Sequence, residues 1–379
     1  MKHRERVLCA VNHKEPDRVP LDLWGSDSRI TDELYFKIIK FLGFEGYGEK
    51  ERPGKTAQYV DYRISDYLDC DFRHAVIGAP KNFKKYIDNN GNTIDEWGVG
   101  TKLVGKYPQV TYHPFYNASI DDIENHKWPV TDDPGRIDGV VERVENWHKN
   151  YDYSITAATI ISGFIAEQYQ YLRGMNEFFT DLYLNEKFAH SLINKIADVL
   201  SELYVFFVKP IGKYIDWIEF ASDFGMQDRL IMSGETFRKF YKEPMKRVFD
   251  NVRKAASEAK IFLHSCGSVR ELIPDFIDMG VEIISSVQPL AKDMDSFELK
   301  KEFGKDLVFH GGIDIQRALT GSREQTIYET KKRIKDYAQG GGYICGPSNH
   351  FQPDIPVENF FALYEAARTY GKYPVNIYL

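Results

Sequence analysis

The chain has 379 residues, of which 43% are hydrophobic and 28% are charged, and its formal net charge is −7 at pH 7. This is the composition of a globular protein, and the absence of any basic block argues against a nucleic-acid partner. The first twenty residues hold no uninterrupted apolar stretch like that of a secretory signal, and no run approaches the ~20 apolar residues of a membrane helix. We therefore expect a cytoplasmic protein that binds neither nucleic acid nor membrane.

Eight short apolar segments, most of them separated by stretches of helical periodicity, predict β-strands. They are residues 19–24, 72–77, 154–160, 216–221, 260–264, 281–286, 307–312 and 342–346. Helices are predicted twice within 170–208 and once each at 234–257, 268–279, 293–303, 322–338 and 356–371. Strands that alternate with helices favour a closed (β/α)8 barrel of the TIM type, with a doubly wound open sheet as the alternative.

An insertion interrupts this alternation in the N-terminal half. The sequence "DNNGNT" at 88–93 is typical of a hairpin turn, so a β-hairpin is predicted within 80–110. Residues 113–135 have the composition of a loop with turns. Ser322 and Gln325 form the pattern of a helix capping box. We expect one (β/α)8 barrel domain over 1–379, with the insertion at about 80–150.

The four cysteines, Cys9, Cys70, Cys266 and Cys345, are too few for a disulfide scaffold. In a reducing compartment they are free thiols or metal ligands. A lone buried cysteine is most often a small apolar side chain, and a packing role is the simpler interpretation of Cys9 and Cys70.

The other two cysteines lie where predicted strands end. His264 is the last residue of the strand 260–264 and Cys266 follows it, whereas Cys345 lies at the end of the strand 342–346. The strands of a barrel deliver their last residues to one rim, where active sites form. One imidazole and two thiolates, with a fourth position open, are typical of a catalytic zinc site. Glu219 or Asp223, near the end of the strand 216–221, could complete the ligand set.

Further candidates lie on the same rim. His310 belongs to the strand 307–312 and, with Asp223, is a candidate catalytic residue. Gly311 and Gly312 would let the backbone approach a bound cofactor, and Asp314 would contact the cofactor or hold the loop. Each of these residues could equally have a structural role.

The sequence also resembles a known superfamily. Long segments are similar to uroporphyrinogen decarboxylases and their relatives, among them "RVLCAVNHKEPDRVPLDLW" (6–24), "IFLHSCGSVRELIPDFIDMGVEIIS" (261–285), "LVFHGGIDIQRALTGSREQT" (307–326) and "GGYICGPSNHFQPDIPVENFFALYEAAR" (341–368). The resemblance covers most of the chain except 80–150, and it implies a (β/α)8 barrel.

Two chemistries occur in that superfamily. The decarboxylases carry an R-Q-A-G-R pattern after the first strand; here the segment is "LWGSDSRITDELY", in which Arg29 alone could correspond. The zinc-dependent, corrinoid-linked methyltransferases, which include methylcobamide:coenzyme M methyltransferases and components of methyl-ether demethylation systems, carry H-x-C and a distant C-terminal cysteine. His264, Cys266 and Cys345 match that pattern, so the resemblance favours the methyltransferase branch.

The resemblance thus implies a zinc-dependent methyltransferase of one-carbon metabolism. It would move a methyl group between a corrinoid, supplied by a partner protein, and a small thiol, ether or similar substrate. One alternative is decarboxylation of a tetrapyrrole in porphyrin biosynthesis. Another is a non-catalytic protein that binds zinc or a tetrapyrrole on the same barrel.

Overall fold

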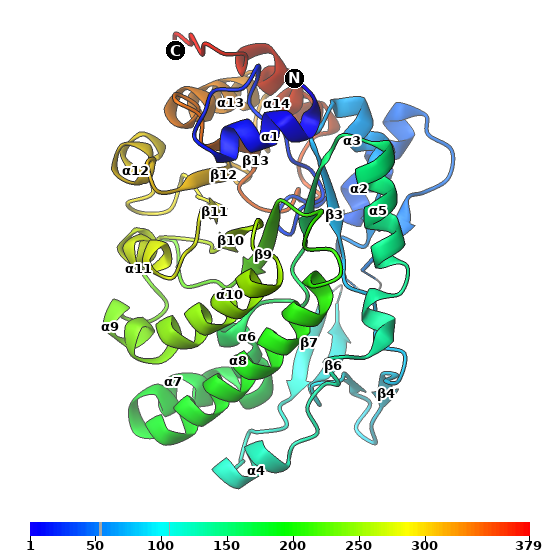
Figure 1. The fold of residues 1–379 in the computed structure, drawn as a ribbon, viewed down its shortest axis with the longest axis vertical. Coiled ribbons are helices and arrows are strands. Elements are labelled where there is room, and N and C mark those ends of the chain that lie inside the picture. Colours follow the sequence, from blue (N-terminus) through cyan, green and yellow to red (C-terminus); the bar gives the residue numbers. More distant parts are fainter. Residues whose placement is uncertain (53–54, 106) are drawn as a thin grey trace.

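The computed structural model describes residues 1–52, 55–105 and 107–379, and its centre is a curled parallel sheet (Figure 1). Seven strands follow one another in the order β13-β12-β11-β10-β9-β8-β3. Their bounds are β3 Phe72–Ala75, β8 Ser154–Ala157, β9 Trp217–Ala221, β10 Lys260–His264, β11 Ile283–Ser285, β12 Val308–Ile313 and β13 Tyr343–Pro347. Seven of the eight predicted strands are therefore confirmed.

The eighth predicted strand, 19–24, is not a regular strand, yet it lies between the two ends of the sheet. Asp22 N donates to the Cys345 carbonyl at 3.0 Å, and Cys345 N donates to the Pro20 carbonyl at 2.8 Å. On the other side, Asp71 N donates to the Leu21 carbonyl at 2.9 Å. These backbone hydrogen bonds join β13 to the segment that leads into β3, so the curled sheet is bridged as in a TIM barrel.

Helices cover the outside of the sheet (Figure 1). The predicted pair within 170–208 is three helices, because Gly174, at φ +102°, interrupts the first of them. The α-helices are α1 His3–Val11, α2 Asp32–Leu42, α3 Tyr62–Leu68, α4 Ile120–Asn125, α5 Val140–Asn150, α6 Ile165–Arg173, α7 Met175–Leu184, α8 Glu186–Val208, α9 Gly234–Phe237, α10 Glu243–Ala255, α11 Ile273–Asp278, α12 Ser296–Phe303, α13 Arg323–Tyr337 and α14 Val357–Tyr370. Shorter helical turns are η1 Pro134–Ile137, η2 Arg238–Lys242 and η3 Arg270–Leu272. No helix in the described ranges is both long enough and apolar enough to cross a bilayer.

The insertion is larger than the predicted hairpin. It is an antiparallel sheet of four strands, β4 Tyr86–Ile87, β5 Thr93–Ile94, β6 Gly100–Val104 and β7 Tyr107–Tyr112. The predicted turn at 88–93 joins β4 to β5, and the predicted loop 113–135 contains α4. Figure 1 shows this sheet at the end of the molecule opposite the two termini. A second small pair, β1 Glu49–Lys50 and β2 Tyr59–Val60, lies earlier in the chain.

The barrel interior has two layers with different chemistry. Side chains alternate along a strand, so residues two apart point to the same face. The first inward layer is apolar and packs on Val7 and Val11 of α1; it consists of Phe72, Trp217, Phe262, Ile283, Val308 and Ile344. Two residues further along each strand the inward positions are polar and buried: His74, Glu219, His264, Ser285 and His310. This polar layer leads directly to the rim where the predicted site lies.

Candidate metal centre

Three potential metal ligands meet at the rim beyond β9 and β10. The ligand atoms of Asp223, His264 and Cys266 all lie within 4.8 Å of one another. The Cys266 sulfur is 3.2 Å from His264 Nε2, and Asp223 Oδ1 is 3.7 Å from the same nitrogen. His264 is buried, Cys266 is half-buried and Asp223 is exposed, so the cluster has one face toward solvent. A divalent metal ion with an exchangeable fourth ligand fits this arrangement.

Close packing of two loops brings Asp223 and Cys266 together. A Cβ added at Gly225 would lie 2.5 Å from the Cys266 carbonyl oxygen. A Cβ added at Gly267, whose φ is +79°, would lie 2.5 Å from the carbonyl carbon of Gly225. Across this contact Cys266 N donates to Asp223 Oδ1 at 2.8 Å. Glycine is required at both positions because any Cβ would force the loops apart.

Polar side chains surround the Cys266 sulfur. Asn349 Nδ2 lies 3.3 Å from it, Gln288 Nε2 lies 3.6 Å away, and the Ser286 hydroxyl lies 3.7 Å away. Contacts of this kind fix the position of the sulfur, which faces the other two potential ligands. The sequence prediction missed Asn349 and Gln288, since each lies in a loop without a recognisable pattern.

Cys345, predicted to be a ligand, is not part of this cluster. Its neighbour Ile344 occupies the inward apolar layer, so Cys345 points outward, into the core that contains Tyr343 and Tyr364. Burial there raises the pKa of its thiol to about 12, which keeps it protonated. The structure does not bring Cys345 to the rim, because the residue lies on the outward face of its strand.

Glu219, the other predicted ligand, is held inside the barrel. Its carboxylate accepts hydrogen bonds from Ser26 N at 2.9 Å and from the Thr156 hydroxyl at 2.9 Å, and it lies 3.2 Å from His74 Nδ1. Burial raises its pKa, but the His74 ring outweighs that effect and the pKa is lowered. With its oxygens engaged in this way, Glu219 does not belong to the cluster at the rim. It is also absent from the other group of potential metal ligands in the described residues, which is Asp22, Asp27 and His310.

His310, a predicted catalytic residue, lies in the buried polar layer rather than at the rim. Its Nε2 is 3.0 Å from Asp22 Oδ2, and its Nδ1 is 3.3 Å from the Ser285 hydroxyl and 3.6 Å from Asp27 Oδ2. Burial lowers its pKa, but the Asp27 and Asp22 carboxylates raise it to about 10. His310 therefore carries a proton at neutral pH and stabilises the two carboxylates.

The predicted cofactor-binding residues have structural partners. Gly311 and Gly312, at φ +84° and +85°, pair with Cys345 and Gly346 of β13. The Asp314 carboxylate accepts hydrogen bonds from the backbone of Gln316 at 2.8 Å and from two following residues. Asp314 thus holds its own loop, which is one of the two roles predicted for it.

A cavity of about 720 Å³ lies between the rim and the insertion. It begins at Ser26, next to the site, and its apolar wall includes Ile77, Phe83, Trp97 and Tyr171. Arg29 and Arg52 also line this cavity. Arg29 is 2% exposed and lies 3.4 Å from Glu51, whereas Arg52 has no ion pair in the described ranges. Burial and the charge of Arg29 lower the Arg52 pKa to about 10, although Glu51 opposes them, so Arg52 is a buried cation beside a second one.

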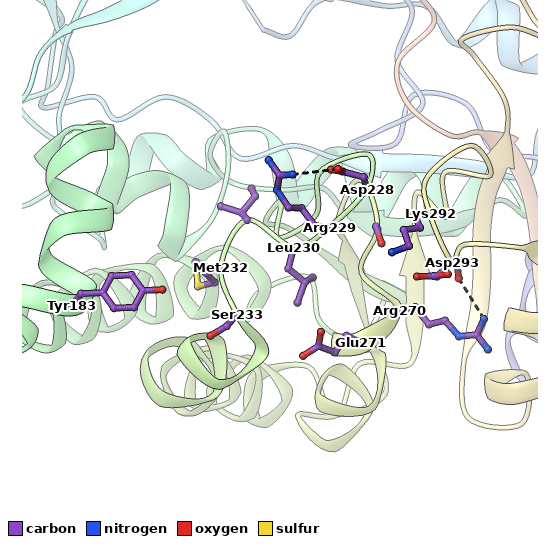
Figure 2. A pocket seen from close by; sticks show the side chains of 12 residues that line it. Tyr183, Asp228, Arg229, Leu230, Met232, Ser233, Arg270, Glu271, Lys292 and Asp293 are labelled. Carbon is purple, nitrogen blue, oxygen red and sulfur yellow. Dashed lines mark hydrogen bonds and ion pairs between the residues drawn. The ribbon is translucent and has the colours of Figure 1, made fainter.

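A second cavity, of about 810 Å³, is lined by the segment 228–233 and by Arg270, Glu271, Lys292 and Asp293 (Figure 2). Its lining holds equal numbers of acidic and basic residues, namely Asp228, Glu271 and Asp293 against Arg229, Arg270 and Lys292. Arg229 lies 3.2 Å from Asp228, and Arg270 contacts the Asp293 carbonyl and the Glu302 carboxylate. Figure 2 shows Tyr183 of α7 on the opposite side of the cavity from Arg270 and Asp293. Because its charges balance, this cavity offers less attraction for a charged ligand than the first.

Comparison with known proteins agrees with this fold. The model of the Uroporphyrinogen decarboxylase (URO-D) family matches residues 95–370. A curated protein, the methylcobamide:CoM methyltransferase MtaA of Methanosarcina barkeri, is 28% identical over 140 residues, which are 37% of this chain and 38% of that protein. The solved structure of a methyltransferase from Methanosarcina mazei superposes with a TM-score of 0.65 at 18% identity and covers 97% of this chain and 99% of its own.

The first prediction concerns metal binding. Cys266→Ser and Asp223→Asn each remove one ligand from the cluster, so we expect zinc content after dialysis to fall from about one per chain to well below half. Metal analysis of the purified proteins measures this directly.

Cys345→Ala is the matched control. It removes a buried sulfur that the metal does not need, so it should retain zinc while losing about 1–2 kcal/mol of stability. Loss of zinc from Cys345→Ala together with full retention by Cys266→Ser would contradict the assignment of Cys266, rather than Cys345, as a metal ligand.

The second prediction concerns pH. Burial lowers the His74 pKa, but Asp22 and Glu219 outweigh this and raise it to about 9. The charged ring therefore contributes stability fully below pH ~6.5, the ordinary pKa, and this contribution is lost as pH rises through 9. Unfolding in urea should show a loss of about 1–3 kcal/mol between pH 6.5 and 9.5. His74→Gln should show a shallower slope; an identical slope would refute the assignment.

Proposed function

The chain belongs to the uroporphyrinogen decarboxylase family, and from that membership we propose that it is a zinc-dependent methyltransferase. It moves a methyl group between a corrinoid carried by a partner protein and a small substrate bound at the barrel rim. The observation that carries the proposal is the cluster of Asp223, His264 and Cys266, which has the donor types and the solvent-facing side of a catalytic metal site.

Of the ligands predicted from the sequence, the proposal keeps His264, Cys266 and Asp223, and it leaves out Cys345 and Glu219. One thiolate, one imidazole and one carboxylate suit zinc, and the two anionic groups neutralise a divalent ion. When bound there, zinc would acidify a thiol or polarise the oxygen of an alcohol or ether. Both uses need the face that Asp223 and Cys266 leave exposed.

The surrounding residues prepare the site for that chemistry. Asn349 and Gln288 hold the Cys266 sulfur by hydrogen bonds, which restrain it as a ligand and reduce its own nucleophilicity. The cavity of about 720 Å³ beside Ser26 offers room for a small substrate. The curated relative is named a methylcobamide:CoM methyltransferase, and this name supports a methylated corrinoid as the second reactant. Because the alignment spans 38% of that protein, its activity comes to this chain only as a proposal.

The cavity favours a substrate with an anionic end and an apolar body. The Arg52 side chain has no ion pair in the described ranges. Burial and the positive charges of Arg52 and Arg29 lower the pKa of the nearby His350 to about 3. A carboxylate or sulfonate would neutralise that charge, while Trp97 and Tyr171 would contact the apolar part.

The same cations favour the alternative function. A tetrapyrrole decarboxylase needs basic side chains for its substrate's carboxylates, and Arg29 and Arg52 are two such groups. That reaction needs no metal ion, so dependence on zinc separates the two functions.

The third prediction tests methyl transfer. With methylcobalamin as the probe, the zinc-loaded protein should methylate a thiol or, in reverse, demethylate a methyl ether with cob(I)alamin. Cys266→Ser and treatment with a chelator should each lower the rate on the order of 100-fold or more, because the metal supplies the activation. Turnover of uroporphyrinogen by the metal-free protein would instead establish the decarboxylase.

The fourth prediction concerns the anionic group. Arg52→Gln should raise KM for a carboxylate-bearing substrate about 10-fold, the effect of one charge-assisted hydrogen bond, and leave a neutral analogue unchanged. Arg229→Gln, in the second cavity, serves as the matched control and should change neither. Equal effects of Arg52→Gln on both substrates would argue against anion recognition.

A further inference from the structure

Asp27 lies behind the candidate metal centre, on the side away from solvent. Its Oδ2 is 3.3 Å from His264 Nδ1, while the opposite nitrogen of that ring, Nε2, is 3.2 Å from the Cys266 sulfur. We propose that Asp27 is a positioning residue of the metal centre, which holds the His264 ring with Nδ1 protonated and Nε2 directed at the metal. This inference rests on the proposed function, because it assumes that a metal ion binds there.

The tautomer of an imidazole decides whether it can bind a metal. A neutral ring has one protonated nitrogen, and the metal needs the lone pair on the other. If Nδ1 donates its proton to Asp27, Nε2 is left to bind the ion beside Cys266 and Asp223. A negative charge behind the ring also makes Nε2 a stronger ligand.

Asp27 is itself held firmly in place. It is 2% exposed, and its Oδ2 accepts a hydrogen bond from the Ser285 hydroxyl. His310 Nδ1 lies 3.6 Å from the same oxygen. The other oxygen, Oδ1, has no hydrogen-bond partner in the described part of the chain. A buried oxygen without a partner is costly, so stability alone does not account for a carboxylate at this position.

The support continues through a buried chain of alternating rings and carboxylates. His310 contacts Asp22 at 3.0 Å, Asp22 contacts His74 at 2.9 Å, and His74 contacts Glu219 at 3.2 Å. The neighbouring carboxylates raise the pKa of His74 to about 9 and that of His310 to about 10, although burial opposes them. Three carboxylates therefore face two charged rings, and the remaining negative charge lies behind the His264 ring.

The first test uses the wild-type protein. In the zinc-loaded form, a long-range nitrogen–proton correlation spectrum should show His264 protonated at Nδ1 and bound to metal through Nε2. Metal on Nδ1 with the proton on Nε2 would overturn the proposal. A wild-type protein that takes up no zinc would overturn the proposed function as well.

The second test uses Asp27→Asn, which keeps the size of the side chain and removes its charge. Zinc affinity, measured by competition with a chelator, should weaken 10- to 100-fold, the usual effect of losing the carboxylate behind a histidine ligand. Visible spectra of the cobalt-substituted protein should change as well, since the ligand field depends on how the ring is held. Zinc affinity within twofold of wild type would refute the role of Asp27 alone.

Two further variants complete the design. Asp181→Asn removes another buried carboxylate, one that pairs with Arg173 at 2.8 Å, and should leave zinc affinity within twofold. Should Asp27→Asn fail to fold, Ser285→Ala withdraws one group that holds Asp27 and leaves its carboxylate. A three- to tenfold weaker affinity is expected from Ser285→Ala, and an unchanged affinity would overturn the proposal.

Discussion

A charge buried inside a barrel must be paired, and this requirement shapes the centre of the molecule. Strand alternation places one apolar layer and one polar layer inside the barrel, and water does not reach the second. Each carboxylate there therefore faces an imidazole, from Glu219 through His74 and Asp22 to His310. The candidate metal centre begins where this pairing reaches the rim. There the last ring, His264, faces a carboxylate on one side and the ligand cluster on the other.

Much of the fold could be predicted from the sequence because apolar strands separated by helical periodicity leave a clear pattern. The end of β10 was predicted to the residue, so His264 and Cys266 were assigned correctly to the rim. Cys345 was not, because its position depends on strand alternation: a shift of one residue moves a side chain from the inside to the outside. The neighbouring Ile344 fills the inward position, which the apolar composition of β13 could not reveal.

Other parts of the site could not be predicted because they depend on contacts between distant loops. Asp27 lies in an irregular segment, and its contact with His264 spans 237 residues of sequence. Asn349 and Gln288 reach the Cys266 sulfur from two different loops. The positive charge of the cavity next to Ser26 likewise arises only in the fold, because Arg29 and Arg52 come from different segments of the sequence.

The packing of α1 closes one end of the barrel. Val7 and Val11 fill the N-terminal end and pack on its apolar layer, so molecules reach the polar layer from the opposite rim. Under the proposed function, a small substrate and a large corrinoid protein would share one approach. A docked corrinoid protein would cover the path of the small molecule, so the small molecule would have to bind before it.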